Sequence, residues 1–218
     1  MSALQQLCAA YGAIKGTVVL GIHFDATITD TKGHAMTVVG ATASTAQAKS
    51  GTYSGYFSGS GQYVETASSP DFVFGNSDFT IEMWIMFAAS PPAGGARYFM
   101  VGKQIPGLDQ YYTLQQTSGG LIQFNSPGTP SVSLTSGVAP AASVWHHVAI
   151  TRKAGVFKLF LNGVPTSGVS STVNYTTNMF CVGGANQVTG TSVFHAGYMD
   201  DVRVTSGEAL YDADFSGS

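Results

Sequence analysis

Residues 143–163, SVWHHVAITRKAGVFKLFLNG, constrain the fold of this chain more than any other segment. They contain two runs rich in β-branched and aromatic residues. The turn residues Lys153-Ala154-Gly155 separate the runs, and Asn162-Gly163 ends the second. Asn-Gly is the strongest short-range signal for a tight turn between strands. The segment therefore predicts two antiparallel strands and a second turn that leads into a further one.

Apolar and polar residues alternate with a period of two from about residue 17 to residue 205, as in strands. The clearest run is 78–88, DFTIEMWIMFA, in which one face carries Phe79, Ile81, Met83, Ile85 and Phe87. The opposite face, which includes Trp84, is also mostly apolar, so we predict a central strand covered on both sides. Further strands are predicted at residues 17–24, 34–39, 53–57, 62–66, 98–103, 111–116, 121–125, 145–152, 156–161, 178–182 and 198–205.

Clusters of Gly, Pro, Asn and Ser separate these strands, and the chain has 218 residues, enough for a core without disulfides or metals. The pattern predicts an all-β sandwich of two antiparallel sheets. Residues 91–95 and 125–140 read as loops, and residues 3–11 carry the one helical pattern. The predicted core includes Phe79, Ile81, Trp84, Trp145, Val148, Phe160, Leu161, Tyr198 and Val202.

Composition limits the classes of partner. The formal net charge is −3 and the nine Lys and Arg residues are scattered, so nucleic-acid binding is not expected. No run of about 20 apolar residues predicts a membrane span. Only 10% of residues are charged. Two interpretations remain open: part of the surface is covered by another chain or a second copy, or the surface is rich in Ser, Thr and Gln and stays hydrated without charge.

The N-terminal residues lack the basic start of a secretory signal, since the first Lys is Lys15. We therefore expect a protein made in a cytoplasm, or released by another route such as lysis. Two cysteines, Cys8 and Cys181, could form a bridge, but distant cysteines in a cytosolic chain more often stay as thiols.

Six segments in order carry a family resemblance. They are 19–25 (VLGIHFD), 56–64 (YFSGSGQYV), 78–85 (DFTIEMWI), 145–149 (WHHVA), 159–163 (LFLNG) and 197–204 (GYMDDVRV). Together they resemble the laminin-G-like branch of the concanavalin A-like lectin/glucanase superfamily, in the variant common in structural proteins of tailed bacteriophages. The resemblance implies a jelly-roll domain at residues 17–218 after an N-terminal extension at residues 1–16.

The resemblance to phage proteins implies a non-enzymatic structural protein of a bacteriophage particle, capsid-decorating or tail-associated. Its partners would be other virion proteins and further copies of itself in a homo-oligomer. Its location would be the virion. The N-terminal segment lies outside the family pattern, and two interpretations of its apolar residues remain open. Leu4, Leu7, Tyr11 and Ile14 would attach the protein to the particle or another subunit, or the segment would fold back as an extra element on its own sandwich. The alternative is a glycan-binding module for attachment to a host surface. Tyr98, Tyr111, Tyr112 and Tyr175, near loop-rich regions, are candidate contacts for a glycan or a partner, although tyrosines more often pack in a core or an interface.

Catalytic residues are not expected. A retaining glycosidase needs two carboxyl groups about 5–5.5 Å apart, yet Glu65, Glu82 and Glu208 are isolated in the sequence. Asp200 and Asp201 are adjacent, so we expect them on opposite faces of a strand. Glu82, on the apolar strand, must be paired if buried, and Arg203 is the candidate partner.

Metal binding and cofactors are likewise not expected. Family members often carry Asp where this chain has Ser58 and Gln62, which are poorer ligands for Ca²⁺. His146 and His147 are adjacent, so only one of them is expected to face the core.

Overall fold

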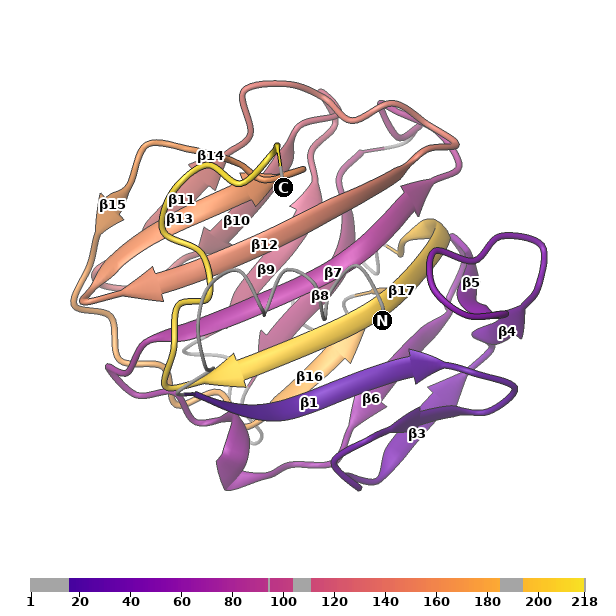
Figure 1. Ribbon diagram of the computed structural model, residues 1–218, viewed down its shortest axis with the longest axis horizontal. Coiled ribbons are helices and arrows are strands. Elements are labelled where there is room, and N and C mark those ends of the chain that lie inside the picture. The colour runs from indigo at the N-terminus through magenta and orange to yellow at the C-terminus, as the bar shows by residue number, and fades with distance from the viewer. Residues whose placement is uncertain (1–15, 94, 104–110, 185–193, 218) are drawn as a thin grey trace.

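Two β-sheets pack face to face in a computed structural model of the chain, which describes residues 16–93, 95–103, 111–184 and 194–217 (Figure 1). All paired strands within each sheet are antiparallel. The all-β sandwich predicted from the sequence is therefore confirmed. Residues 1–15, with the expected attachment residues Leu4, Leu7, Tyr11 and Ile14 and the cysteine Cys8, lie outside the described residues.

The larger sheet has ten strands. Its main path is β14 (Val164–Pro165), β13 (Val156–Leu161), β12 (Trp145–Lys153), β7 (Phe79–Phe87), β17 (Ala196–Ser206), β1 (Thr17–Phe24) and β2 (Ile28–Asp30). The remaining strands are β15 (Val169–Ser170), which pairs with β13, and β5 (Ser54–Ser58), which pairs with β17 and with β4 (Thr42–Ser44). The central strand β7 lies between β12 and β17, as its two apolar faces predicted.

The smaller sheet has seven strands and lies behind the larger one in Figure 1. Its order is β11 (Val132–Thr135), β10 (Ile122–Ser126), β9 (Tyr112–Gln116), β8 (Arg97–Lys103), β16 (Met179–Val182), β6 (Tyr63–Thr66) and β3 (Met36–Val39). The 3₁₀-helix η1 (Pro70–Phe72) follows β6. Strands β1 and β13 have the predicted bounds. The sequence missed five strands of two to four residues, among them β11, which lies in the segment 125–140 expected to be a loop.

The core lies between the sheets and is strongly aromatic. On β7 the inward residues are Phe79, Ile81, Met83, Ile85 and Phe87, which are at most 2% exposed. Phe79 stacks on Phe74, with ring centroids 4.6 Å apart. The inward period-two pattern of β7 thus places its five large side chains in one layer.

The outer face of the larger sheet is partly covered by the chain's own C-terminal residues. Tyr211 and Phe215 pack against Ala149 of β12 and Phe160 of β13. In Figure 1 this yellow segment passes in front of β12 and β13. It explains why Phe160 is buried although it lies on the outer face.

Three residues expected in the core instead lie on this outer face: Trp84, Trp145 and Tyr198 are only partly buried. The other six predicted core residues are buried. The correction follows from strand periodicity, because Val148 points inward and Trp145, an odd number of residues away, must point outward. Both faces of these strands carry apolar residues, so composition alone did not identify the inner one.

Candidate functional site

A row of large side chains crosses four strands on the outer face of the larger sheet. Trp145 of β12 pairs with Met86 of β7, Met86 with Tyr198 of β17, and Tyr198 with Tyr56 of β5. We call these four residues the aromatic row. Neighbouring strands lie about 4.8 Å apart, so the row extends about 14 Å across the sheet.

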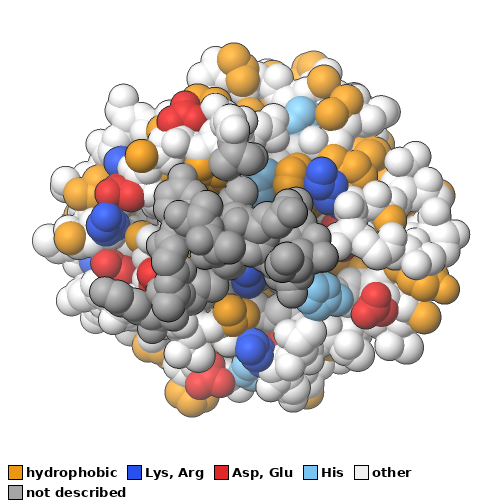
Figure 2. All heavy atoms as spheres, viewed as in Figure 1, with side chains coloured by type: hydrophobic (Ala, Val, Ile, Leu, Met, Phe, Trp, Pro, Cys, Tyr) orange, Lys and Arg blue, Asp and Glu red, His pale blue; other side chains and the backbone are white. Residues whose placement is uncertain are grey.

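The rings of the aromatic row are accessible. Tyr56 is 37% exposed, and Trp145 and Tyr198 are half-buried, whereas Met86 is buried between them. The rings of Tyr56 and Tyr198 lie 5.2 Å apart with an interplanar angle of 47°. Figure 2 shows hydrophobic side chains gathered at the upper right of this face, where β7 ends and β12 begins in Figure 1. The sheet thus presents a firm, partly apolar platform.

Lys49 and Trp84 lie beside the aromatic row. Trp84 is two residues from Met86 on the same face of β7, and the Lys49 ammonium lies 3.9 Å from the centroid of the Trp84 ring. The backbone N–H groups of Lys49 and Ser50 each donate to Asp200 Oδ2 at 3.0 Å. Asp200 therefore anchors the loop that places an exposed cation next to the row.

A buried carboxylate, that of Glu82, lies further along β7. It is 1% exposed. It accepts hydrogen bonds from Arg203 Nε at 2.6 Å and Tyr211 Oη at 2.6 Å, and its Oε2 lies 3.2 Å from His147 Nε2. Burial by itself raises the pKa of Glu82, but His147, Arg203 and Tyr211 outweigh it and lower the pKa to about 2. The predicted pairing of Glu82 with Arg203 is present, and two further partners complete it.

The two adjacent aspartates do not lie on opposite faces, and the expectation that they would is wrong. A register shift interrupts the pairing of β17 with β7 between Asp200 and Arg203, and Asp201 has φ of 46°. Asp200 faces the loop of Lys49, while Asp201 lies 3.2 Å from Nδ1 of His23 on the same outer face. The bulge adds a residue to one strand and so cancels the alternation.

The adjacent histidines separate as expected. His147 lies on the outer face, where its ring is 5.2 Å from that of Trp84. His146 points to the other side of β12, where its Nε2 lies 2.9 Å from the carbonyl oxygen of Ala141 and its Nδ1 is 3.0 Å from Asn162 Nδ2. Both rings therefore have structural partners.

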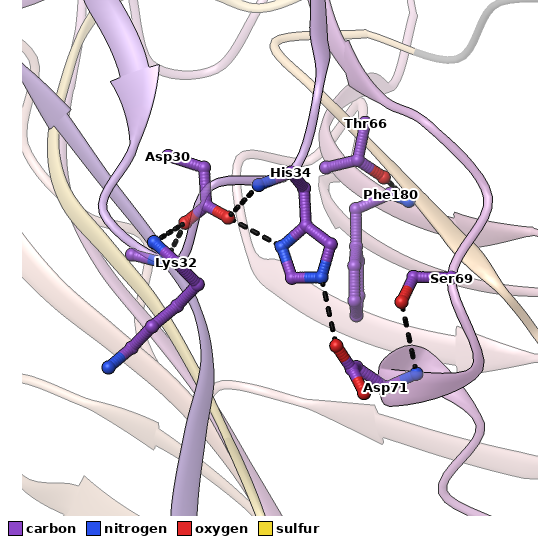
Figure 3. Close-up of polar contacts among 8 residues, drawn as sticks. Asp30, Lys32, His34, Thr66, Ser69, Asp71 and Phe180 are labelled. Carbon is purple, nitrogen blue, oxygen red and sulfur yellow. Dashed lines mark hydrogen bonds and ion pairs between the residues drawn. The ribbon is translucent and has the colours of Figure 1, made fainter.

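A second polar cluster joins β2 to the 3₁₀-helix (Figure 3). Asp30 accepts the backbone N–H groups of Gly21, Lys32 and His34 at 2.8, 3.1 and 3.1 Å. His34 bridges Asp30 and Asp71, with nitrogen–oxygen distances of 2.5 and 3.1 Å. Burial tends to raise the pKa of Asp30, but these hydrogen bonds lower it. Because Asp30 uses both oxygens within the protein, we interpret the cluster as a structural clamp.

The predicted tyrosines divide into two groups. Tyr98 and Tyr111, together with Tyr63, are partly buried and pack on Val101 and Cys181 on the outer face of the smaller sheet. Tyr112 and Tyr175 are 1% and 0% exposed and pack against each other in the core, with ring centroids 4.8 Å apart. These two cannot contact a glycan or a partner, which corrects that expectation.

Polar side chains accompany Tyr98 and Tyr111 on the smaller sheet. Gln115 donates to Gln123 at 2.6 Å, and Lys103 pairs with Glu65 at 2.5 Å. Each of these groups is used by a neighbour, so this face offers fewer unengaged donors and acceptors than its composition suggests. We therefore take the aromatic row as the stronger candidate.

The positions where calcium ligands were considered form a neutral hydrogen-bonded turn. The Gln62 side chain accepts from the backbone of Ser58 and donates to the carbonyl of Gly40 at 2.8 Å. Among the described residues, no group of three or more His, Cys, Asp and Glu side chains could hold a metal ion. The same part of the chain has no helix with the length and hydrophobicity of a membrane span.

A groove of about 650 Å³ opens at the sandwich edge between β11 and the β13–β14 hairpin. Ser133, Thr135 and Asn162 provide polar groups, and Val138 and Val164 are 67% and 52% exposed on its walls. None of the described residues that line it is charged.

Comparison with known proteins supports the fold. Residues 58–214 match the family model Laminin_G_3, described as the concanavalin A-like lectin/glucanases superfamily. No curated protein matches the sequence.

Solved structures of similar fold include domain 4 of AbnA, an extracellular GH43 arabinanase from Geobacillus stearothermophilus, in complex with arabinotriose. Its TM-score is 0.71 at 16% identity, covering 89% of this chain and 94% of that one. The binding domain of botulinum neurotoxin serotype G has a TM-score of 0.65 at 11% identity, covering 89% and 49%. The binding domain of Paraclostridial Mosquitocidal Protein 1 has a TM-score of 0.63 at 13% sequence identity. The match covers 88% of this chain and 50% of that one. The chain spans about half of each toxin binding domain, and these likenesses show the fold alone.

Proposed function

Because the chain belongs to the concanavalin A-like lectin/glucanases superfamily, we propose that it is a non-enzymatic glycan-binding module whose binding surface is the aromatic row. The observation that carries this proposal is the alignment of Trp145, Tyr198 and Tyr56 on one sheet face, with Met86 between the first two and the three rings accessible. The structurally similar arabinanase domain, which was solved with arabinotriose, supports the same class of ligand.

Sugar rings have apolar C–H faces that pack on aromatic rings, and their hydroxyl groups need polar neighbours. The row supplies the rings, and the phenol hydroxyls of Tyr56 and Tyr198 supply donors and acceptors. A sheet holds these side chains in fixed relative positions, so little conformational entropy is lost when a ligand binds. The length of the row suits a short stretch of a linear glycan.

The state of Glu82 supports the proposal that the module is not an enzyme. Glu82 is buried and hydrogen-bonded to three side chains, among them Tyr211 from the segment that covers it. A general acid needs a raised pKa, whereas the pKa of Glu82 is lowered to about 2. Glu82 thus stabilises the sheet.

A glycan array with the purified protein tests the proposal. We expect a defined set of glycans to bind, and Trp145→Ala and Tyr198→Ala to reduce binding at least tenfold while the variants stay folded by circular dichroism. Tyr111→Ala, on the smaller sheet, is the matched control and should bind like the wild type. If only Tyr111→Ala loses binding, the glycan site lies on the smaller sheet and the aromatic row is the wrong surface. If no glycan binds the wild-type protein, the proposal is wrong.

A structural role in a bacteriophage particle is the second candidate. The uncharged groove with exposed Val138 and Val164, together with the low charge content of the chain, favours contact with another protein subunit. The two roles are compatible, because a particle subunit can carry a glycan site. Mass spectrometry of purified particles tests it: a decoration protein would be present in many copies and a tail adhesin in a few, whereas its absence from particles would exclude this role.

A further inference from the structure

We propose that the aromatic row takes an acidic saccharide, one that carries a carboxylate, and that Lys49 holds this carboxylate. The inference rests on the proposed function and names the ligand class of the same site. Lys49 was not a candidate from the sequence, because it lies in a polar loop between predicted strands.

The position of Lys49 is the first argument. Its ammonium lies 3.9 Å from the centroid of the Trp84 ring. Trp84 and Met86 are two residues apart on one face of β7, about 7 Å along the strand. The cation therefore lies next to the middle of the aromatic row, within reach of a substituent on a sugar bound there.

The second argument is that Lys49 has no anionic partner. Across the described ranges, no carboxylate lies within ion-pair distance of its ammonium. The Trp84 ring orients the ammonium but accepts no hydrogen bond in the usual sense and does not neutralise its charge. An exposed Lys without a counter-ion can form charge-assisted hydrogen bonds with an incoming carboxylate.

The acidic groups near the row are buried or paired. Asp201, on the same outer face, lies 3.2 Å from His23 Nδ1, and its side chain is 9% exposed. Asp200 Oδ2 accepts the N–H groups of Lys49 and Ser50, and its Oδ1 accepts that of Asp201 at 2.9 Å, so both oxygens are engaged and the residue is buried. Glu82 is neutralised by its pairing with Arg203. His147 faces Glu82 and adds no negative charge. The accessible charge beside the row is therefore positive.

Three pairs of probes would test the proposal. Two pairs differ only in the carboxyl group: galacturonic acid trimer and its carboxyl-reduced form, and a hyaluronan oligosaccharide and its carboxyl-reduced form. The third pair, sialyllactose and lactose, differs by a whole acidic sugar. Affinities are measured by titration calorimetry in about 20 mM and about 500 mM salt. In at least one pair we expect the acidic member to bind about three- to tenfold more tightly at low salt, with the ratio falling at high salt.

Substitutions separate a contact with Lys49 from a general effect of charge. Lys49→Gln should bring the ratio of acidic to neutral affinity close to one. Lys32→Gln removes the same charge from the turn after β2, away from the row, and should leave the ratio as in the wild type. If Lys32→Gln lowers the ratio as much as Lys49→Gln does, the preference reflects net charge and the proposal is wrong.

The remaining outcomes distinguish this inference from the proposed function. Equal or tighter binding of the neutral member in every pair that binds would overturn the acidic ligand but leave the glycan-binding module standing. If neither the array nor these probes gives any binding, both proposals fall. If binding of an acidic probe survives Trp145→Ala unchanged, Lys49 acts at another surface and the inference is again wrong.

Discussion

Glu82 and Tyr211 form a 2.6 Å hydrogen bond between the central strand of the larger sheet and the C-terminal segment that crosses its outer face. The same carboxylate binds Arg203 and contacts His147, so one buried acid connects β7, β12, β17 and the C-terminal residues. All three partners lie at least 65 residues from Glu82 in the sequence. This hub fixes the C-terminal segment on the sheet.

Replacement of Tyr211 by Phe should lower the free energy of unfolding by about 1–3 kcal/mol, because it leaves a buried charged acceptor without one donor while the ring packing remains. Chemical denaturation at neutral pH measures the change. Tyr56→Phe, which removes a hydroxyl from an exposed ring, is the control and should change stability by less than about 0.5 kcal/mol. Equal effects of the two variants would contradict the role given to the hydrogen bond.

The hub should also make stability depend on acidic pH. The pKa of Glu82 is about 2 in the folded protein, against 4.5 for an ordinary glutamate. The ionised form is therefore favoured in the folded state, so the contribution is fully present above pH about 5 and is lost as pH falls toward 2. The loss is on the order of 3 kcal/mol. Denaturation at a series of pH values should show it, and Glu82→Gln should flatten the profile in this range; an unchanged slope in that variant would refute the assignment.

Replacing the partly buried Trp145 should lower the free energy of unfolding by less than replacing an aromatic residue of the core. Phe79→Ala removes a side chain that is 0% exposed and should cost about 3–5 kcal/mol. Trp145→Ala, on the outer face, should cost about 1–2 kcal/mol, since only part of its ring leaves water on folding. Denaturant midpoints of the two variants measure these losses. An equal or larger loss of stability in Trp145→Ala would contradict the placement of Trp145 on the outer face.

Asp30→Asn should destabilise the protein by about 1–3 kcal/mol, because an amide NH₂ would replace one carboxylate oxygen in a site built from donors. Asp71→Asn is the matched control: its carboxylate also binds His34, but its side chain is 57% exposed. It should cost less than about 1 kcal/mol. Thermal unfolding of both variants gives the comparison, and a larger effect at Asp71 would contradict the clamp centred on Asp30.

The sequence predicted the strands well because their signals are local. Alternation with period two and turn signals such as Asn162-Gly163 act within a few residues, and β1 and β13 were predicted with their observed bounds. Strands as short as β14 and β15 were not predicted, because two residues are too few to show an alternating pattern. The pairing of Glu82 with Arg203 was also predictable, since a buried carboxylate on an apolar strand requires a partner.

The candidate site was not predictable in the same way. Trp145, Tyr198 and Tyr56 belong to three strands, and only the pairing register places them in one row. Tyr112 and Tyr175 were candidates for exposure and proved to be core residues, because the residues near a loop in sequence can still point inward. Sequence proximity to a loop therefore says little about which tyrosines reach solvent.

The sequence by itself determined the class of fold, the positions of the longer strands and the family, since each depends on residue patterns along the chain. The tertiary structure alone decided which of two apolar faces became the core, because β7 and β12 carry large apolar residues on both faces and only packing against the smaller sheet distinguishes them. It also decided the common orientation of Asp200 and Asp201, which a bulge produces, and the approach of Lys49 to Trp84, which depends on a hydrogen bond between a loop and a distant strand.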